Sequence, residues 1–495
     1  MFRNKHIDST LRSVHDWFAR QLGDLKPKGA TASLDGVRGL AFLIVLCQHV
    51  SSMTANLGFW QPGANPFLAA FLLSGSSGVT LFFVLSGFLL FLPYAQAFVL
   101  KKTWPEAKIF YLRRVLRIFP GYFFSLFILV VFSKPFLLQP HNWRQLLPFL
   151  TFTMEFGSSA LINGPYWTLA VEFQYYLLLP LIALAIYSLT RLVRPEKRIR
   201  IVVVCLLLMI VWGLATRAFG EHSMLHPDEH FGLPPAIFAH LLQAIYGNYG
   251  KFFEDFAVGM LIALGYISVL NSPQKEQYLR RLHQAGPLFC VISVLCFVFA
   301  IMRNYSEAYL HFWSFVPSFF LRLPWLTEFA FAIGYGCFVL AVLFNRPGQW
   351  IKRIFEWTPL RWIGLISYSL YIWHLPILLA IETNIGPSLK HLSHPLAFFL
   401  SWFLVFSVSV FFCFFTYILI EKPGMQLSER LRQQILQRRA NASVAPQTSQ
   451  QGNFDPLDEE TEKRPVVRPG YVEEPSLAEV RRNGSSVVAD RSGLA

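Results

Sequence analysis

Long apolar runs alternate with short polar segments along most of the chain. About ten of these runs approach the ~20 apolar residues that a helix needs to cross a bilayer. They cover residues 37–53, 67–92, 119–132, 166–189, 201–215, 252–270, 287–302, 325–344, 362–381 and 396–420. Because a helix satisfies its own backbone hydrogen bonds in lipid, the pattern predicts an all-α, polytopic integral membrane protein.

Three of the runs, 119–132, 201–215 and 287–302, are short for a membrane span. At ~1.5 Å of rise per residue, helices of this length cover well under the ~30 Å of a hydrocarbon core. We therefore expect these helices to be tilted, re-entrant or longer than their apolar runs.

The composition excludes a water-soluble fold and changes how the net charge is interpreted. Hydrophobic residues make up 54% of the chain and charged residues 15%, whereas soluble domains have about 25% charged residues. A net charge of +14 would suggest a nucleic-acid partner in a soluble protein, but here it fits the positive-inside rule. Lys and Arg gather before residue 38, in alternate loops and after residue 420. Both termini are therefore expected in the cytoplasm, and nucleic acid is not expected as a partner.

The two ends of the chain differ from the membrane part. Residues 1–33 are polar with apolar residues at helical spacing, which predicts a cytoplasmic segment with an amphipathic helix on the inner leaflet or docked on the protein. Residues 34–425 form the predicted membrane domain, and we expect all the chemistry there. Residues 426–495 are rich in Gln, Ser, Glu, Arg and Pro, which is typical of a disordered cytoplasmic tail.

Two polar side chains of the first apolar run, Arg38 and His49, are predicted on one face of a helix. The ~11 steps between them, at ~100° each, return the helix to nearly the same face and rise ~16 Å. Arg38 is then at the inner interface and His49 past the middle of the membrane, which suits an elongated anionic ligand entering from the cytoplasm. The alternative is a positive-inside arginine and a histidine hydrogen-bonded between helices.

Further ionisable residues lie in or beside apolar runs, where they are costly and usually functional. Arg114 and Arg117 share one helical face and could hold phosphate oxygens, or could only mark the inner side of the membrane. Glu172 lies among aromatic residues near the outer end of the fourth span, where it suits recognition of a polar or sugar ligand from outside or orientation of a catalytic group. His374 is expected at a depth similar to that of the first-span histidine, which suggests a catalytic chamber or a proton path.

Other polar features support weaker predictions. Glu254, Asp255 and Glu328 stand at outward ends of spans, where they line a vestibule or serve as solvated caps. The histidines of the long outer loop have no regular ligand spacing, so no metal cofactor is expected. Pro376 is expected to bend the ninth span and free a backbone carbonyl beside a cavity.

Five segments in a fixed order carry a resemblance to a known family. They are LDGVRGLA…QH at Leu34–His49, GVTLFFVLSGFLL at Gly78–Leu90, RRVLRIFPGYF at Arg113–Phe123, YWTLAVEFQYY at Tyr166–Tyr176, and ISYSLYIWHLPI with the closing IEKP at Ile420–Pro423. Each segment is short, but the ordered set over residues 34–423 resembles the integral-membrane acyltransferase 3 family, whose members acylate sugars and other acceptors.

The resemblance implies a donor and assigns residues to it. The family's arginine–histidine motif falls on Arg38 and His49, its arginine pair on Arg114 and Arg117, and its fourth-span carboxylate on Glu172. The implied donor is acyl-coenzyme A, and acetyl is the family's commonest cargo. The arginines would bind the phosphates of the donor while its thioester reached His49.

The implied chemistry is general-base catalysis. His49 would take a proton from the acceptor hydroxyl, or would itself carry the acyl group as an acyl-histidine. Asp35 would orient the first-span arginine. Glu172, His374, Tyr368 or Tyr371 would bind the acceptor or stabilise the oxyanion.

The acceptor and the assembly stay open. A glycan, a lipid-linked sugar or a secreted small molecule could accept the acyl group, membrane lipid surrounds the protein, and a homo-oligomer is compatible with the sequence. Many family members carry an extracellular esterase-like domain that is not expected here, so the acceptor is acylated directly or through a separate protein. The alternative function is a proton-coupled transporter of a small solute that uses the same buried ionisable residues.

Overall fold

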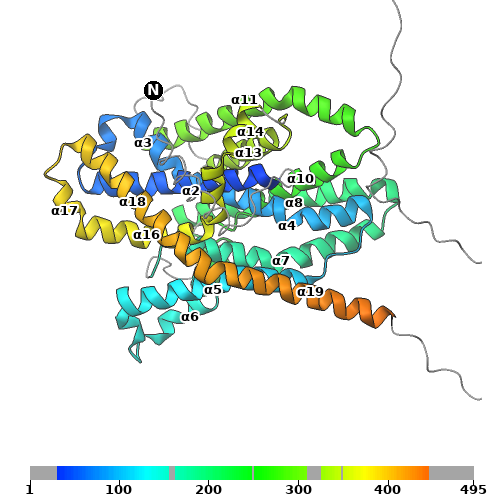
Figure 1. Ribbon diagram of the computed structural model, residues 1–495, viewed down its shortest axis with the longest axis horizontal. Helices are drawn as coiled ribbons and strands as arrows, with labels where there is room; N and C mark the ends of the chain where they lie inside the picture. The colour runs from blue at the N-terminus through cyan, green and yellow to red at the C-terminus, as the bar shows by residue number, and fades with distance from the viewer. Residues whose placement is uncertain (1–30, 155–161, 248–249, 309–324, 347–348, 445–495) are drawn as a thin grey trace, which may run out of the picture. The chain divides into compact units, whose positions relative to one another are not determined.

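The computed structural model describes residues 31–154, 162–247, 250–308, 325–346 and 349–444 (Figure 1). These residues are mostly helical and contain no strand, which confirms the predicted all-α class. Contacts divide the chain into two units, residues 1–437 and 438–495, and the site lies within the first. The expected amphipathic helix before residue 31 lies outside the described residues.

The long helices carry the membrane part of the fold. They are α2 (Thr31–Asn56), α4 (Ser77–Leu100), α5 (Ala107–Ser133), α7 (Tyr166–Arg191), α8 (Arg198–Leu225), α10 (Phe253–Leu270), α11 (Lys275–Ala308), α13 (Trp325–Leu343), α16 (Ser367–Asn384), α18 (His394–Thr416) and α19 (Lys422–Val444). Shorter helices connect them, namely α3 (Pro66–Leu73), α6 (Leu147–Leu150), α9 (Pro235–Ile245), α14 (Trp350–Phe355), α15 (Thr358–Leu365) and α17 (Gly386–Leu389).

The number of spans agrees with the sequence pattern. Among the described residues, 9 helices are long and apolar enough to cross a membrane, or up to 10 when the bent pair α15 and α16 counts as one span. The three short runs lie inside the longer helices α5, α8 and α11. Their polar flanks continue the helix, so α5 begins at Ala107 and carries Arg114 and Arg117 within it.

The ninth span is a broken helix. Helices α15 and α16 meet at Ile366 with a bend of 76°. Pro376, which we expected to bend this span, lies inside α16 instead. A close helix crossing lies beside the break, because a Cβ atom on Gly364 would overlap the carbonyl oxygen of Asp35 on α2. The backbone of α15 is therefore held directly against the N-terminal half of α2.

A second close crossing joins α4 to α10. A Cβ atom on Gly87 of α4 would overlap the Phe256 carbonyl, and one on Gly259 of α10 would overlap the Val84 carbonyl. The two glycines allow the helix backbones to touch, as small residues commonly do between membrane helices. Ser86, next to Gly87, is thereby held in place on α4.

The start of α10 differs from the prediction of solvated caps. Glu254 and Asp255 are 1% and 0% exposed, and Arg217 of α8 forms an ion pair with Glu254 at 2.6 Å. The Arg217 guanidinium also lies 4.4 Å from the centre of the Phe252 ring. An ion pair between helices, and not water, thus holds the Oε1 atom of the buried Glu254.

The C-terminal helix extends further than expected. Helix α18 continues through a π-helical turn, Tyr417–Glu421, into α19, which is drawn in orange in Figure 1. Residues 426–444, which were expected to belong to a disordered tail, are therefore helical. Residues 426–444 combine Leu and Ile with Gln, Arg and Glu, which are all good helix formers. The rest of the expected tail, residues 445–495, lies outside the described residues.

Candidate active site

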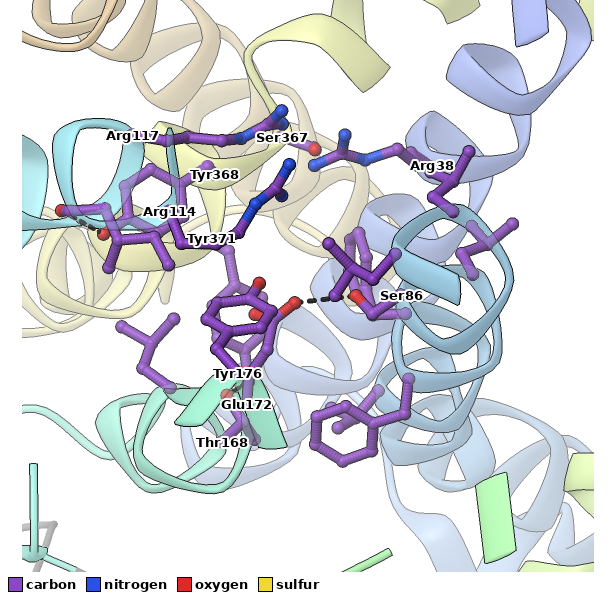
Figure 2. Close-up of a pocket in the computed structure, with 18 residues that line it drawn as sticks. Arg38, Ser86, Arg114, Arg117, Thr168, Glu172, Tyr176, Ser367, Tyr368 and Tyr371 are labelled. Atoms are coloured by element: carbon purple, nitrogen blue, oxygen red, sulfur yellow. Dashed lines mark hydrogen bonds between the residues drawn. The ribbon is translucent and has the colours of Figure 1, made fainter. Parts of the chain in front are cut away.

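Helices α2, α4, α5, α7 and α16 enclose a cavity of about 150 Å³. Three arginines line it, Arg38 from α2 and Arg114 and Arg117 from α5. Figure 2 shows their guanidinium groups pointing toward a common region beside Ser367, with Glu172 below. Arg38 of the first predicted span thus meets two arginines that directly precede the third predicted span.

The positive charge of this cavity is not neutralised by ion pairs. In the part of the chain that the structure describes, no carboxylate lies within ion-pair distance of Arg38, Arg114 or Arg117. The Nε atom of Arg114 is buried and makes no hydrogen bond among the described residues. Its Cζ atom lies 6.0 Å from the Phe110 ring centre and 5.9 Å from that of Tyr176. The guanidinium groups are therefore available to an anionic ligand, which they suit as bidentate donors.

Glu172 contributes the carboxylate of the cavity. It extends from α7 and accepts a hydrogen bond of 2.7 Å from the Ser86 hydroxyl of α4. Tyr176 follows one turn later on α7 and lies beside it in Figure 2. A carboxylate fixed in this way can accept a hydrogen bond from a ligand hydroxyl while it balances part of the arginine charge.

Hydroxyl groups of α16 complete the wall. Ser367, Tyr368 and Tyr371 line the cavity immediately after the break at Ile366. Tyr368 donates a hydrogen bond of 2.7 Å to the Ile118 carbonyl, and Thr168 donates one of 2.7 Å to the Tyr371 hydroxyl. The Ser367 hydroxyl is buried and has no hydrogen-bond partner among the described residues. The break therefore places the polar N-terminal end of α16 at the cavity. An unbroken helix would present only its side chains there.

The two histidines form a separate pair next to this cavity. The His49 and His374 ring centres are 5.0 Å apart with an interplanar angle of 66°. Tyr371 connects the pair to the cavity, because it lines the cavity and its ring centre is 5.8 Å from that of His374. Neither histidine lines the arginine cavity itself.

The hydrogen bonds of the histidines define their tautomers. Nδ1 of His49 lies 2.9 Å from the Val45 carbonyl, and Nδ1 of His374 lies 2.9 Å from the Tyr371 carbonyl. A carbonyl oxygen can only accept, so Nδ1 carries the proton on both rings. The basic nitrogen of each neutral ring is therefore Nε2. His49 is partly exposed, whereas His374 is 0% exposed, which makes His49 the histidine that a substrate can reach.

Asp35 lies behind the cavity and does not line it. It interacts electrostatically with Arg38, Arg117 and Arg361. Its backbone is held by the crossing with Gly364 of α15. The geometry therefore gives Asp35 a supporting position toward the arginines. No group of three or more His, Cys, Asp or Glu side chains suited to a metal ion occurs among the described residues.

The sequence pattern did not identify Glu421 as part of this region. Glu421 ends the π-helical turn, is 4% exposed and accepts a hydrogen bond from Ser369. Thr416 donates to Ser369 in turn, at 3.1 Å. A Cβ atom on Gly121 of α5 would lie 3.0 Å from the Tyr368 ring and 3.4 Å from Cγ of Glu421, so the three residues pack together. The IEKP segment was the available signal, but only the π-helical turn shows that its carboxylate points inward.

With this geometry in place, the comparison with known proteins defines the class. Residues 31–418 match the profile of the acyltransferase domain, so this chain belongs to the acyltransferase 3 family, as the ordered segments predicted. The protein is a multi-pass membrane protein of that family. No solved structure matches it.

Its curated relatives are longer proteins. The chain is 26% identical over 373 residues to the peptidoglycan O-acetyltransferase OatA of Listeria monocytogenes, covering 70% of this chain and 49% of the relative. It is 26% identical over 414 residues to the putative peptidoglycan O-acetyltransferase YrhL of Bacillus subtilis, covering 79% and 54%. A putative O-acetyltransferase of Staphylococcus aureus is 23% identical over 418 residues, covering 79% and 56%. The chain thus spans about half the length of the curated relatives it matches.

Proposed function

We propose that this protein is a membrane-embedded O-acyltransferase that moves an acetyl group from cytoplasmic acetyl-coenzyme A to a hydroxyl group of a glycan. The observation that carries the proposal is the convergence of Arg38, Arg114 and Arg117 on one cavity without ion-pair partners. The names of the OatA and YrhL relatives, both peptidoglycan O-acetyltransferases, support a glycan acceptor. Lipid-linked sugars and secreted small molecules also carry acceptor hydroxyl groups, and assays with each acceptor would distinguish them from a glycan.

The arginines are the proposed donor site. A coenzyme A thioester carries phosphates on a long flexible arm, and guanidinium groups bind phosphate oxygens through paired hydrogen bonds. Arg38 and Arg117 come from different helices, so they can hold the anion from two directions. Asp35 supports these arginines by its charge. The distribution of Lys and Arg supports a cytoplasmic location for this end of the protein, and for both termini.

His49 is the proposed general base. Its neutral Nε2 takes the proton of the acceptor hydroxyl, and the hydroxyl oxygen attacks the thioester carbonyl carbon. The tetrahedral intermediate then collapses, the carbon–sulfur bond breaks, and the proton on Nε2 passes to the leaving thiolate. The products are the acetyl ester and free coenzyme A, and the histidine returns to its neutral form. An acyl-histidine route would differ by giving ping-pong kinetics.

Tyr371 and His374 have supporting roles in this proposal. The acetyl end of the donor would pass the ring of Tyr371, which separates the cavity from the histidines. The hydroxyl groups of Tyr371 and Ser367 are the nearest candidates for stabilising the oxyanion. His374, which is fully buried, would hold the His49 ring and would not touch the acceptor. Glu172 would accept a hydrogen bond from the sugar or from the donor arm.

Reconstituted vesicles test the proposal against the transporter alternative. Proteoliposomes would be loaded with acetyl-coenzyme A labelled in the acetyl group, and a peptidoglycan fragment would be supplied outside. The proposal expects labelled ester on the glycan and an equal amount of free coenzyme A inside. Movement of an unmodified solute without coenzyme A release would overturn it.

A further inference from the structure

A second chamber adjoins the arginine cavity. It has a volume of about 480 Å³ and is bounded by the end of α4, the connection between α4 and α5, the start of α5, and α19. Leu89, Leu90 and Arg114 line both spaces, so the two are adjacent and share the Arg114 side chain as part of their walls. The narrow inner cavity thus lies next to a wider space, and α19 crosses α5 closely, because a Cβ atom on Gly424 would overlap the Leu116 carbonyl.

The wider chamber has a net positive charge and is open to water. Lys102, Arg113 and Arg432 line it together with one carboxylate, Glu106, and Lys102 and Arg113 are exposed. Arg432 is 37% exposed and pairs with Glu429 at 2.7 Å on the same helix. An exposed ion pair of this kind is weak, so an anionic ligand can compete for Arg432. None of these cations belongs to the arginine set of the inner cavity.

An aromatic ring forms part of the same wall. Trp104 lies in the connection after α4, where Lys101 has a left-handed backbone with φ of 52° that turns the chain. Its ring centre is 5.5 Å from that of Tyr94, 5.5 Å from that of Phe98 and 4.7 Å from that of Tyr187. These contacts fix the indole at the edge of the chamber. A fixed indole beside cations is the combination that holds a nucleobase next to its phosphates.

We propose that this chamber binds the adenosine phosphate end of the acyl-coenzyme A donor, and we call it the nucleotide vestibule. The inference rests on the proposed function, and it assigns to donor binding residues that the family motifs did not assign. The residues of the vestibule proposed to contact the nucleotide are Tyr94, Lys102, Trp104, Arg113, Arg432 and Leu436.

The sizes and charges of the two spaces match the two ends of the donor. The adenosine with its 3′-phosphate is bulky and anionic, so it requires the wide cationic space. The diphosphate and the pantetheine arm are slender, so they can pass Arg114 into the inner cavity, where the three arginines bind the diphosphate. Arg432 and Leu436 belong to α19, which gives the helix after the last span a role in donor binding.

Anionic lipid headgroups offer the same phosphate chemistry from another source. A headgroup lacks the base that Trp104 would hold, and it is anchored in the leaflet. If the nucleotide occupies the vestibule, KM should depend on the structure of the donor. If a headgroup occupies it, KM should depend on the lipid composition of the vesicle.

The decisive experiment compares two donors. S-acetylpantetheine carries the same thioester as acetyl-coenzyme A but lacks the nucleotide. KM and kcat would be measured for both donors with the full-length protein in neutral phosphatidylcholine vesicles. The variants are Arg113→Ala and Arg432→Ala, whose side chains are exposed or partly exposed and whose loss should not prevent folding. Lys108→Ala is the matched control, because Lys108 is an exposed cation of α5 outside both spaces.

The vestibule predicts that each variant raises KM for acetyl-coenzyme A about tenfold, as expected for one lost charge-assisted hydrogen bond. KM for S-acetylpantetheine and kcat with either donor should not change, and the control should match the wild type throughout. An unchanged KM for acetyl-coenzyme A in both variants would overturn the inference, as would an equal rise for both donors. An effect that appears only in vesicles containing phosphatidylglycerol would identify a lipid headgroup as the occupant and would also overturn it. Failure of the wild type with both donors would instead reject the proposed function.

Discussion

His49 and His374, from the first and the ninth predicted spans, are stacked edge to face with ring centres 5.0 Å apart. His374 has no exposed surface, and both of its carbonyl contacts are to its own helix. Its Nε2 atom is buried without a hydrogen-bond partner among the described residues. The pair therefore consists of one reachable base and one buried ring that holds it.

This relationship predicts different effects for two substitutions of His374. His374→Ala should remove the ring that supports His49 and lower kcat about tenfold, with little change in the donor KM. His374→Phe keeps an aromatic ring at the same place and should restore most of the activity. Steady-state kinetics of both variants would check this, and a loss in His374→Phe as large as in the alanine variant would show that the imidazole itself takes part in proton transfer.

The arginine cavity predicts a defect in donor binding. Arg38→Ala and Arg114→Ala should each raise KM for acetyl-coenzyme A by about tenfold or more, because each removes a charge-assisted contact with an anion. Arg117→Lys should retain part of the binding, since lysine keeps the charge but loses the paired hydrogen bonds. If KM for the donor is unchanged in both alanine variants, the arginines do not bind its phosphates.

The Ser86–Glu172 hydrogen bond predicts graded effects on the reaction. Ser86→Ala removes one donor to the Glu172 carboxylate and should cost roughly 1 kcal/mol, about a fivefold loss in kcat/KM. Glu172→Gln removes the charge itself and should cost more. Acceptor and donor titrations would show which substrate Glu172 contacts, and equal losses in the two variants would mean that the hydrogen bond alone matters.

The crossing of α2 and α15 predicts a loss of stability from a single methyl group. Gly364→Ala would place a Cβ atom on the Asp35 carbonyl and must push the helices apart. We expect a lower thermal unfolding temperature in detergent and weaker donor binding, because Arg38 follows one turn after Asp35. Gly265→Ala is the control, since a Cβ atom there meets nothing within 4 Å and alanine favours the helix. Equal behaviour of the two variants would contradict the close crossing.

The buried carboxylate of the π-helical turn predicts a role in positioning. Glu421→Gln should keep the hydrogen bond to Ser369 but remove a negative charge from the region of Tyr368. We expect a moderate rise in the donor KM with kcat retained. Ser369→Ala should have a smaller effect through the same contact. A purely structural role would instead lower the unfolding temperature of both variants without any change in KM.

The sequence predicted the fold class and the number of spans because apolar runs of membrane length are a strong signal. It also placed Arg38 and His49 on one helical face, but the ~16 Å rise between them leads them to different neighbours. Arg38 lines the cavity, whereas His49 packs on His374. The break at Ile366 could not be located from the sequence. It lies next to the closely packed Gly364 and not at Pro376, where a bend was expected.

Other parts of the site depend on contacts between distant helices. Ser86 and Ser367 look like ordinary small residues in apolar runs, and only the meeting of α4, α7 and α16 brings them to the cavity. The inward direction of Glu421 requires the π-helical turn. Glu254 was predicted to be solvated at a span end, but it is buried and forms an ion pair with Arg217 of another helix.

If His49 is the base that activates the acceptor, its replacement should stop acetyl transfer. His49→Ala would be reconstituted in vesicles, checked for insertion and thermal stability, and assayed for acetyl transfer from acetyl-coenzyme A to the glycan. His240→Ala, at an exposed position of α9, is the control. General-base catalysis predicts a loss in kcat of roughly 10²–10⁴-fold with donor binding retained. Wild-type activity in the folded His49→Ala protein would show that His49 is not the base.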